Sequence, residues 1–335
     1  MSPRILVAIG AFLIPLGVAA PAGAHGVNGP PASNFATRLD GVEPATQATS
    51  VSLAPDRESI SLRVIGKAHV VVLGYRGEPY LRVDAHGVWE NRSSPAVALN
   101  RSRIPGNMRP IARIAAPHWV RISTRPSATW HDHRTHWMGG TTPRAVRQDP
   151  DHGHTITTWS IPMKIDGRDA VIAGAIDWRP PPAAWPWWFL AAALVGAVGV
   201  GSRLPRGARI VGAVLGTMAV AETVHLWGSW PFSDSSVGGR IGEGLPSIGA
   251  ILACVVALVW VARRGVWSAA PVLVLAGLFV FVSGGAADLS TLSHAFVPSR
   301  LDPVVARVLV ALALGLGAGT AIVGLTRLRA VRPET

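Results

Sequence analysis

Hydrophobic and polar positions divide the chain into a short apolar start, a polar middle and a long apolar end. Residues 1–24 begin with a positive charge at Arg4, continue as an apolar stretch and finish with the small residues Ala22-Gly23-Ala24. This order is typical of a secretory signal peptide. We therefore expect cleavage after Ala24, which makes His25 the first residue of the mature chain. An uncleaved anchor helix is the alternative.

The polar middle, residues 25–184, predicts an extracytoplasmic domain built from β-strands. Alternating apolar and polar residues favour six strands, and Asp166-Gly167 between the last two is a hairpin turn signal. The predicted strands are Thr49–Ala54, Ser59–Ile65, His69–Tyr75, His118–Ser123, His154–Met163 and Ala170–Trp178. Gly and Pro recur at short intervals without a long helical period. We therefore expect an antiparallel β-sandwich of six to eight strands, immunoglobulin- or cupredoxin-like.

One segment of this domain, Gly74–Asn100, predicts a turn-rich connector rather than strands. Its polar side chains are Glu78, Tyr80, Asp84, His86 and Glu90. We expect these residues to be solvated loop residues, with participation in a site as the alternative.

The apolar end, residues 185–335, predicts an all-α membrane domain with five transmembrane helices. Each of five apolar stretches is close to the roughly 20 residues that cross a hydrocarbon core. They are Pro186–Gly201, Ile210–Trp227, Leu245–Val261, Trp267–Gly285 and Val304–Leu325.

Arginines flank these spans unevenly and predict the orientation in the membrane. The turns after spans one, three and five contain Arg203, Arg206, Arg209, Arg263, Arg264, Arg327, Arg329 and Arg332. The other two loops contain only Arg240 and Arg300, with Arg307 just inside span five. Positively charged turns face the cytoplasm. We therefore expect a multi-pass protein of the cell membrane, with its amino-terminal domain extracytoplasmic and a short cytoplasmic tail at its carboxyl end.

Composition narrows the classes of function. The chain is 49% hydrophobic, and its net charge of +12 comes from arginine because Lys67 and Lys164 are the only lysines. Nucleic-acid binding would need basic residues gathered on a soluble face, whereas many of these arginines flank apolar spans. The single cysteine, Cys254, excludes an intramolecular disulfide and a cysteine-based zinc site.

The strongest candidate for chemistry is Trp130–Met138, WHDHRTHWM, which places His131, His133 and His136 within six residues. Imidazole is the commonest protein ligand of late transition metals. As a strand, the motif would put His131 and His133 on one face, and as a helical turn His133 and His136. Asp132 is expected to be a ligand, or an acceptor that orients an imidazole. A histidine-rich loop bonded to the sandwich edge is the alternative to a metal site.

Three further histidines extend the metal hypothesis. His152 and His154 follow the motif after one loop, and His25 is the expected mature amino terminus. A terminal histidine offers its amine and a ring nitrogen, and one more histidine completes a nitrogen-rich brace suited to Cu(II). Copper is therefore the expected metal and zinc the alternative. An ordinary flexible terminus remains the other interpretation of His25.

The apolar spans contain few polar groups. Glu222 and His225, three residues apart in the second span, are candidate metal ligands because an ionisable residue inside a membrane is costly and indicates function. An ion pair between Glu222 and Arg307 is the structural alternative. Asp288 and His294 follow the fourth span. No row of acids and histidines reaches the cytoplasmic side, so a complete transport path is not visible.

Over nearly its full length, the chain resembles a group of actinobacterial membrane proteins with an extracytoplasmic WHDHRTHWM domain. The shared stretches are Ala24–Gly26, Gly74–Arg82, Trp130–Met138 and Pro180–Trp188. This resemblance implies the two-domain architecture but no settled activity. The chain is similar, more distantly, to the bacterial CopC/CopD copper-handling proteins. That similarity implies a secreted β-sandwich in which the amino-terminal histidine, here His25, binds copper.

These features predict a membrane-anchored extracytoplasmic metal-binding protein that serves copper acquisition, transfer or tolerance. A membrane-tethered copper or zinc enzyme and a metal-free envelope assembly or partner-binding module are the alternatives. The chain has no HExxH motif and no clear general base beside the histidines, which disfavours the enzyme. The expected partners are the lipid bilayer, a metal ion and other envelope metal-handling proteins, and not nucleic acid.

Overall fold

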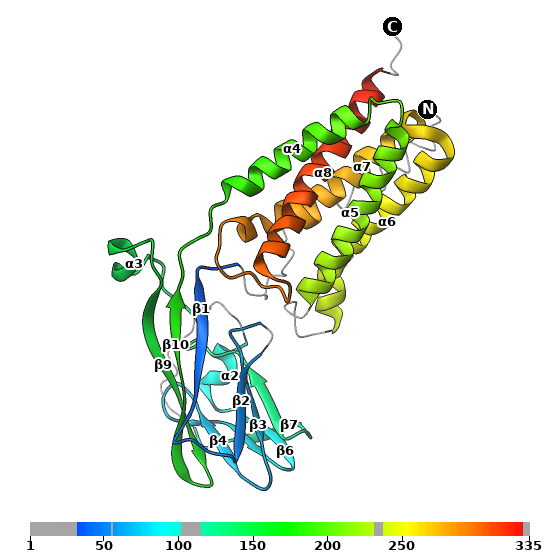
Figure 1. The fold of residues 1–335 in the computed structure, drawn as a ribbon. Helices are drawn as coiled ribbons and strands as arrows, with labels where there is room; N and C mark the ends of the chain where they lie inside the picture. Colours follow the sequence, from blue (N-terminus) through cyan, green and yellow to red (C-terminus); the bar gives the residue numbers. More distant parts are fainter. Residues whose placement is uncertain (1–31, 55, 102–114, 231–236, 331–335) are drawn as a thin grey trace. The chain divides into compact units, whose positions relative to one another are not determined.

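The computed structural model describes residues 32–54, 56–101, 115–230 and 237–330. They form two compact units (Figure 1). The β-rich unit contains the described residues up to Ala183 together with Ser293–Pro303, and the helical unit contains Ala184–Leu292 and the residues from Val304 onward. An antiparallel β region followed by a helical region agrees with the predicted order. The expected signal peptide, residues 1–24, and His25 lie outside the described residues.

Ten strands in the described residues form two antiparallel sheets. They are β1 (Phe35–Glu43), β2 (Thr49–Leu53), β3 (Ile60–Val64), β4 (Val70–Leu73), β5 (Pro79–Asp84), β6 (Gly87–Asn91), β7 (Trp119–Ser123), β8 (Ser127–Trp130), β9 (His154–Ile165) and β10 (Arg168–Trp178). The larger sheet has the order β1-β10-β9-β4-β5-β6-β7 and the smaller one β2-β3-β8. All six predicted strands are confirmed. Two short helices, α2 (Pro95–Leu99) and α3 (Arg144–Gln148), lie in the connections.

The turn between β9 and β10 is the predicted hairpin. Ile165 pairs with Arg168 across it. Asp166 and Gly167 both have positive φ, 49° and 81°. Two consecutive positive φ values match the right-handed twist of the flanking strands, and Asp-Gly adopts them readily.

One apolar core contains side chains from both sheets. Ile60 and Leu62 of β3 alternate inward and belong to the same cluster as Ile161 and Met163 of β9. All four are at most 1% exposed. Burying a side chain of this size contributes roughly 1.5–3 kcal/mol, so the period-two pattern of these strands supplies much of the unit's stability.

The prediction that Gly74–Asn100 is a turn-rich connector is wrong, although His86 is an exposed turn residue as expected. The segment forms β5, β6 and α2. Glu78 and Tyr80 are buried, and Ser94 donates to the Glu78 carboxylate at 2.7 Å. Strands β5 and β6 are short and only two residues separate them. Their alternation of apolar and polar residues was therefore too brief to stand out among the turn-forming residues around it. β1 and β8 were also not predicted, and β1 is interrupted by a bulge at Gly41.

The helical unit contains α4 (Trp185–Gly201), α5 (Gly207–Ser229), α6 (Val237–Ser268), α7 (Ala270–Val280) and α8 (Pro303–Ala330). Beyond α7 the chain continues as a π-helical segment, η3 (Phe281–Gly285), and a 3₁₀ segment, η4 (Ala286–Leu292). Each predicted span overlaps one of these helices. Four helices are long and apolar enough to cross a membrane, whereas α4 is apolar but only 17 residues long.

Glycines on α8 allow the close approach of a neighbouring helix. A Cβ atom at Gly315 would lie 2.6 Å from the carbonyl oxygen of Ala191 on α4, and one at Gly319 would also overlap α4. This pair is therefore a small-xxx-small packing contact. By contrast, a Cβ atom at Gly216 on α5 would meet nothing within 4 Å.

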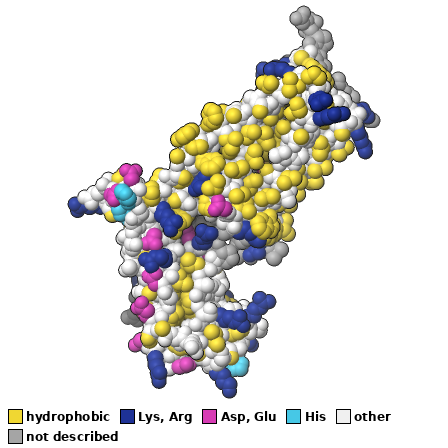
Figure 2. All heavy atoms as spheres, viewed as in Figure 1, with side chains coloured by type: hydrophobic (Ala, Val, Ile, Leu, Met, Phe, Trp, Pro, Cys, Tyr) yellow, Lys and Arg dark blue, Asp and Glu magenta, His cyan; other side chains and the backbone are white. Residues whose placement is uncertain are grey.

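Hydrophobic side chains cover the visible face of the helical unit (Figure 2). The outward-facing large apolar residues of α6 include Leu252, Val255, Val256, Val259 and Trp260. An apolar surface of this extent is typical of helices that contact lipid.

The number of crossings decides on which side of the membrane the carboxyl end lies. If α4 also crosses, there are five crossings, and we expect the arginine-rich turns and the carboxyl end on the cytoplasmic side. Green fluorescent protein fused after Thr335 should therefore be fluorescent, and alkaline phosphatase fused after Pro180 should be active outside. Exchanging the two reporters should abolish both signals. Phosphatase activity at both positions would instead show four crossings and contradict the five-helix topology.

Candidate metal centre

The motif Trp130–Met138 is neither a strand nor a helix. Strand β8 ends at Trp130, and the residues after it form a turn in which the amide of Thr135 donates to the carbonyl of Asp132 at 3.0 Å. Both predicted geometries are therefore wrong. The reason is the Asp132 side chain, which is 0% exposed and accepts hydrogen bonds from the residue two positions ahead.

Asp132 and Arg134 form a bidentate ion pair. The guanidinium Nε and Nη2 lie 2.8 Å and 2.7 Å from the two carboxylate oxygens, and Trp130 Nε1 donates to the carboxylate at 3.3 Å. Burial by itself would raise the pKa of Asp132, but the hydrogen bonds and charge of Arg134 outweigh it and lower that pKa. The structure thus directs this carboxylate to Arg134 and Trp130 rather than to an imidazole.

The turn gathers the three histidines of the motif. The ring centroids of His131 and His136 are 4.7 Å apart, and those of His131 and His133 are 5.3 Å apart. His133 and His136 are separated by 5.6 Å. Neither a strand nor a helix would bring all three rings together, because each of those periods separates one ring from the other two.

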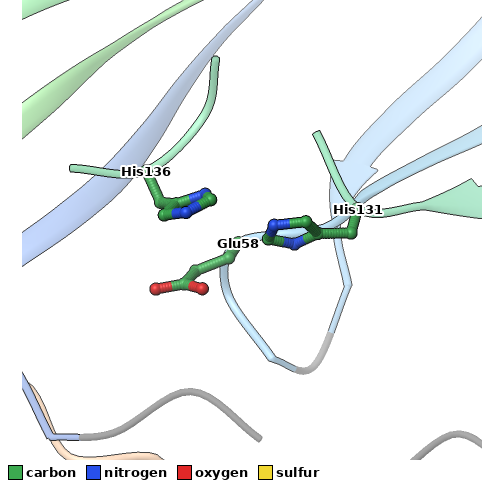
Figure 3. A group of neighbouring side chains, drawn as sticks. All are labelled: Glu58, His131 and His136. Carbon is green, nitrogen blue, oxygen red and sulfur yellow. The ribbon is translucent and has the colours of Figure 1, made fainter. Parts of the chain in front are cut away.

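Glu58 joins this cluster from the loop between β2 and β3 (Figure 3). Glu58, His131 and His136 each offer one ligand atom, and the three atoms lie within 4.8 Å of one another. The register of the small sheet explains the meeting, because Ile60 of β3 pairs with Trp130 of β8. The residues just before β3 therefore lie beside those just after β8.

Hydrogen bonds fix the Glu58 loop. The Asp56 carboxylate accepts the amides of Glu58 and Ser59 at 3.0 Å and 2.8 Å. The hydroxyl of Thr135 lies 2.6 Å from the carbonyl of Glu58 and 2.7 Å from that of Asp132, and its single proton serves one of them at a time. The loop and the histidine turn are therefore linked directly.

Strand β1 holds the other end of the motif. The Thr37 hydroxyl donates to the carbonyl of Thr135, and the ring of Phe35 stacks on Trp137 with centroids 5.1 Å apart. His136 lies between these two contacts in sequence and is 5% exposed.

His133 is fixed from a third direction. Its Nε2 lies 3.0 Å from the carbonyl of Leu99 on α2, and its amide donates to the Tyr75 hydroxyl at 2.9 Å. A carbonyl can only accept, so Nε2 carries the proton. A ring held in this way resembles the backbone-oriented imidazoles of metal sites.

His131 is held in its neutral form. Its Nε2 is buried and has no hydrogen-bond partner among the described residues. Burial and, to a lesser extent, the neighbouring His136 lower the pKa of His131 to about 4, although the charge of Glu58 opposes this. At neutral pH the ring is therefore available as a ligand without losing a proton.

A cleft of about 370 Å³ opens beside the cluster. Its lining includes His133, His136 and Trp137 of the motif and the hydroxyl-bearing Thr157 and Thr158 of β9. Because His136 belongs to both the lining of the cleft and the Glu58 cluster, the cleft borders the candidate centre.

The structure does not bring the other predicted ligands into this cluster. His152 Nδ1 contacts the Asp149 carboxylate at 2.8 Å, and His154 Nε2 lies 2.6 Å from the Asp149 carbonyl. Glu222 and His225 belong to the helical unit. Sequence analysis missed Glu58, and its one available signal was its position directly before a predicted strand.

The Asp132–Arg134 ion pair should contribute strongly to the stability of the β-rich unit. Arg134→Ala leaves a fully buried carboxylate without its partner, so we expect the free energy of unfolding to fall by about 3 kcal/mol. The matched control is Arg38→Ala, because Arg38 pairs with Asp177 at the surface and is 49% exposed; its loss should be below about 1 kcal/mol. Thermal and urea unfolding followed by tryptophan fluorescence measure both. Equal losses of unfolding free energy in the two variants would show that the buried pair stabilises the protein no more than the surface pair does.

The stability of the metal-free protein should fall between about pH 6.5 and pH 4. In this window His131 takes up a proton in the unfolded chain but not in the folded one, so folding is disfavoured as pH falls. Above pH 6.5 the contribution is complete. His131→Gln cannot titrate, so its melting temperature should vary less with pH across the window. Identical pH profiles for the two proteins would contradict the lowered pKa of His131.

Comparison with known proteins adds no family assignment. No protein-family model matches the chain, and neither a curated protein nor a solved structure matches it. The resemblances drawn from sequence motifs therefore stay predictions, and function has to be argued from the site itself.

Proposed function

We propose that the β-rich unit binds one late transition-metal ion through Glu58, His131 and His136. The observation that carries this proposal is the convergence of two imidazoles and one carboxylate, with ligand atoms within 4.8 Å of one another. Ligands about 2.1 Å from one tetrahedral ion are about 3.4 Å apart. The ligand atoms therefore need to approach one another by no more than about 1.4 Å to meet one ion.

The environment of His131 supports the same proposal. A buried polar atom without a hydrogen bond costs about 1–3 kcal/mol, and the Nε2 atom of this ring is such an atom among the described residues. A metal ion would satisfy it. The Asp132–Arg134 pair and the contacts from β1 hold the ring positions before an ion arrives, which lowers the entropy lost on binding.

Cu(II) is the proposed metal and Zn(II) the alternative. Nitrogen from imidazole and oxygen from carboxylate suit both ions, whereas Ca²⁺ takes oxygen ligands. Copper also binds a given site of this kind more tightly than zinc does. Cleavage after Ala24 would let His25, which lies outside the described residues, add its amine and ring nitrogen.

In this proposal the β-rich unit is extracytoplasmic and anchored to the lipid bilayer by five helices. The arginine asymmetry supports the orientation, and the shared core of the two sheets supports an immunoglobulin- or cupredoxin-like sandwich. The protein then serves copper acquisition, transfer or tolerance and exchanges the ion with other envelope metal-handling proteins. The similarity to CopC/CopD proteins implies the same role.

The cleft beside His136 favours one second function, a membrane-tethered copper or zinc enzyme. Two histidines and one glutamate leave a coordination position open, as in catalytic zinc sites, and the cleft offers room for a substrate next to it. A bound ion would supply Lewis acidity there. Turnover of an added substrate by the metal-loaded protein, and not by the metal-free protein, distinguishes this function from transfer or storage.

Loss of a ligand should weaken metal binding sharply. We expect His131→Ala and Glu58→Gln to lower the affinity of the full chain for Cu(II) by more than the roughly 10–100-fold typical of outer-shell changes. His152→Ala is the matched control because His152 is exposed and contacts Asp149 instead. Competition titration with a chelator of known affinity measures all three. Equal affinities for the His131 and His152 variants would refute the centre, and no binding by any form would favour the metal-free envelope module.

The contribution of His25 is tested in the same assay. One alanine placed before His25, with the mature terminus verified by mass spectrometry, removes the terminal amine from reach and leaves every side chain in place. Weaker Cu(II) binding and altered hyperfine structure in the electron paramagnetic resonance spectrum indicate the brace. Unchanged binding places the ion on the described residues alone.

A further inference from the structure

Basic side chains gather at one end of the helical unit. Helices α4, α6 and α8 finish at this end, and α5 and α7 begin there (Figure 1). The arginines at this end are Arg203, Arg206, Arg209, Arg263, Arg264, Arg327 and Arg329. The sequence has no aspartate or glutamate in residues 185–221, 244–287 or 303–330, which form the adjoining parts of these helices. The arginine-rich end therefore carries a strong positive charge.

The buried acids of the helical unit do not neutralise these arginines, because they have other partners. Ser283 of η3 donates to the Glu222 carboxylate at 3.3 Å, and His225 Nε2 lies 3.1 Å from Asp288 Oδ2. The ion pair considered for Glu222 and Arg307 is not formed, and Arg307 donates to a backbone carbonyl instead. Among the described residues, the arginines of this end have no carboxylate partner.

Arg327 is the arginine that helix packing encloses at this end. It is 9% exposed, its Nη2 donates to the carbonyl of Ser202 at 2.8 Å, and its guanidinium lies 5.5 Å from the ring of Trp267. Its Nε atom is buried and has no hydrogen-bond partner among the described residues. Arg203, just after α4, is close enough to repel this guanidinium. Arg327 thus has one unused donor and no counter-charge.

The turn between α4 and α5 fixes the position of the Arg327 side chain. A Cβ atom at Gly207 would lie 2.5 Å from the carbonyl oxygen of Ser202, so only glycine allows the turn to close this tightly. The same oxygen accepts the hydrogen bond from Arg327. The guanidinium is therefore held in place before a ligand arrives, which lowers the entropy lost on binding.

Neither helix dipoles nor membrane orientation accounts for this arrangement. Three helix C-termini and two N-termini meet at this end, and their partial charges of about 0.5 each sum to about −0.5. That sum is smaller than the charge of one guanidinium, so most of the positive charge stays uncompensated. Orientation requires arginines in the turns between helices. It does not require one that is buried against a neighbouring helix, as Arg327 is.

We propose that the arginine-rich end of the helical unit binds the headgroup phosphate of an anionic phospholipid, with Arg327 and Arg203 as the contacting groups. Arginine suits phosphate because its planar guanidinium donates two parallel hydrogen bonds to the phosphate oxygens. A phosphate between the two guanidinium groups replaces their mutual repulsion by two attractions.

A membrane lipid is the source of phosphate that fits this position. The arginines lie at the ends of α5, α6 and α8, which are long and apolar enough to cross a membrane, and lipid headgroups lie at that depth. Trp267 and Leu204 at the same end are 61% and 50% exposed. A tryptophan and an apolar side chain at this depth suit the boundary between headgroups and acyl chains. The site shares no residue with the Glu58 centre and does not depend on metal binding.

The lipid affinity of the delipidated full chain in dodecyl maltoside tests this proposal. Native mass spectrometry measures the binding of dioleoylphosphatidylglycerol and, in a parallel titration, of dioleoylphosphatidylcholine. The two lipids share their acyl chains and a phosphate, but only the first has a net negative charge. We expect it to bind at least about fivefold more tightly, the factor that one arginine contributes near a membrane surface. Equal affinities for the two lipids overturn the proposal.

Single substitutions locate the site. Arg327→Gln should remove most of the preference for the anionic lipid. The control Arg168→Gln makes the same change of charge at an exposed position of β10 and should keep the preference. A preference that survives Arg327→Gln, or that Arg168→Gln lowers equally, overturns the assignment. If Arg327→Gln impairs folding, Arg203→Gln replaces it because Arg203 is exposed; an unchanged preference in that variant also overturns the assignment.

Inorganic phosphate distinguishes a lipid site from a site for free anions. Sodium phosphate should displace the bound phosphatidylglycerol no more than sodium chloride does at the same ionic strength. Greater displacement by phosphate would show that the site takes the free anion and would overturn the lipid assignment.

Discussion

The ion pair between Asp132 and Arg134 is the interaction on which the histidine cluster depends. A carboxylate that is 0% exposed is stable only with a partner, and Arg134 satisfies both of its oxygens. The partners are two residues apart, so the pair closes the chain into a turn immediately after β8. That turn gathers the rings of His131, His133 and His136, which a regular strand or helix would spread.

Segments that are distant in sequence then hold the turn in place. Strand β1 contacts it through Thr37 and Phe35. The carbonyl of Leu99 at the end of α2 accepts a hydrogen bond from the His133 ring, and the loop after β2 places Glu58 beside the other two histidines. The rings are therefore restrained by the packing of a whole sheet unit. Burial also keeps His131 neutral, and both effects favour a site that meets an ion with little rearrangement.

Hydrophobic periodicity and turn residues predicted most strands and helices of this chain. The position of the site residues depends instead on which strands pair and in what register. Six strands, the Asp166-Gly167 hairpin and the apolar helices followed from periodicity and turn chemistry. Glu58 escaped prediction because its approach to His131 depends on the register of β3 against β8, and β8 itself, four residues long, gave too short a pattern. The sequence also did not determine the role of Asp132. An aspartate can bind a metal or pair with an arginine, and only its burial and its neighbours in the structure show which of the two it does.

The three histidines of the motif and Asp288 of the helical unit lie where regular backbone hydrogen bonding ends. A strand or helix repeats its side-chain directions at a fixed period, so the three histidines of this short motif converge only where that period is broken. In the β-rich unit the break is the turn after β8, and in the helical unit it is η3 and η4. Irregular backbone at membrane depth is tolerated only where protein surrounds it, and a Cβ atom at Gly285 would clash with Leu314 of α8. Glu222 and His225 on α5 contact this break, because Ser283 of η3 donates to the Glu222 carboxylate and Asp288 of η4 pairs with His225. The buried polar groups of the helical unit therefore satisfy one another where the backbone is irregular and enclosed by protein.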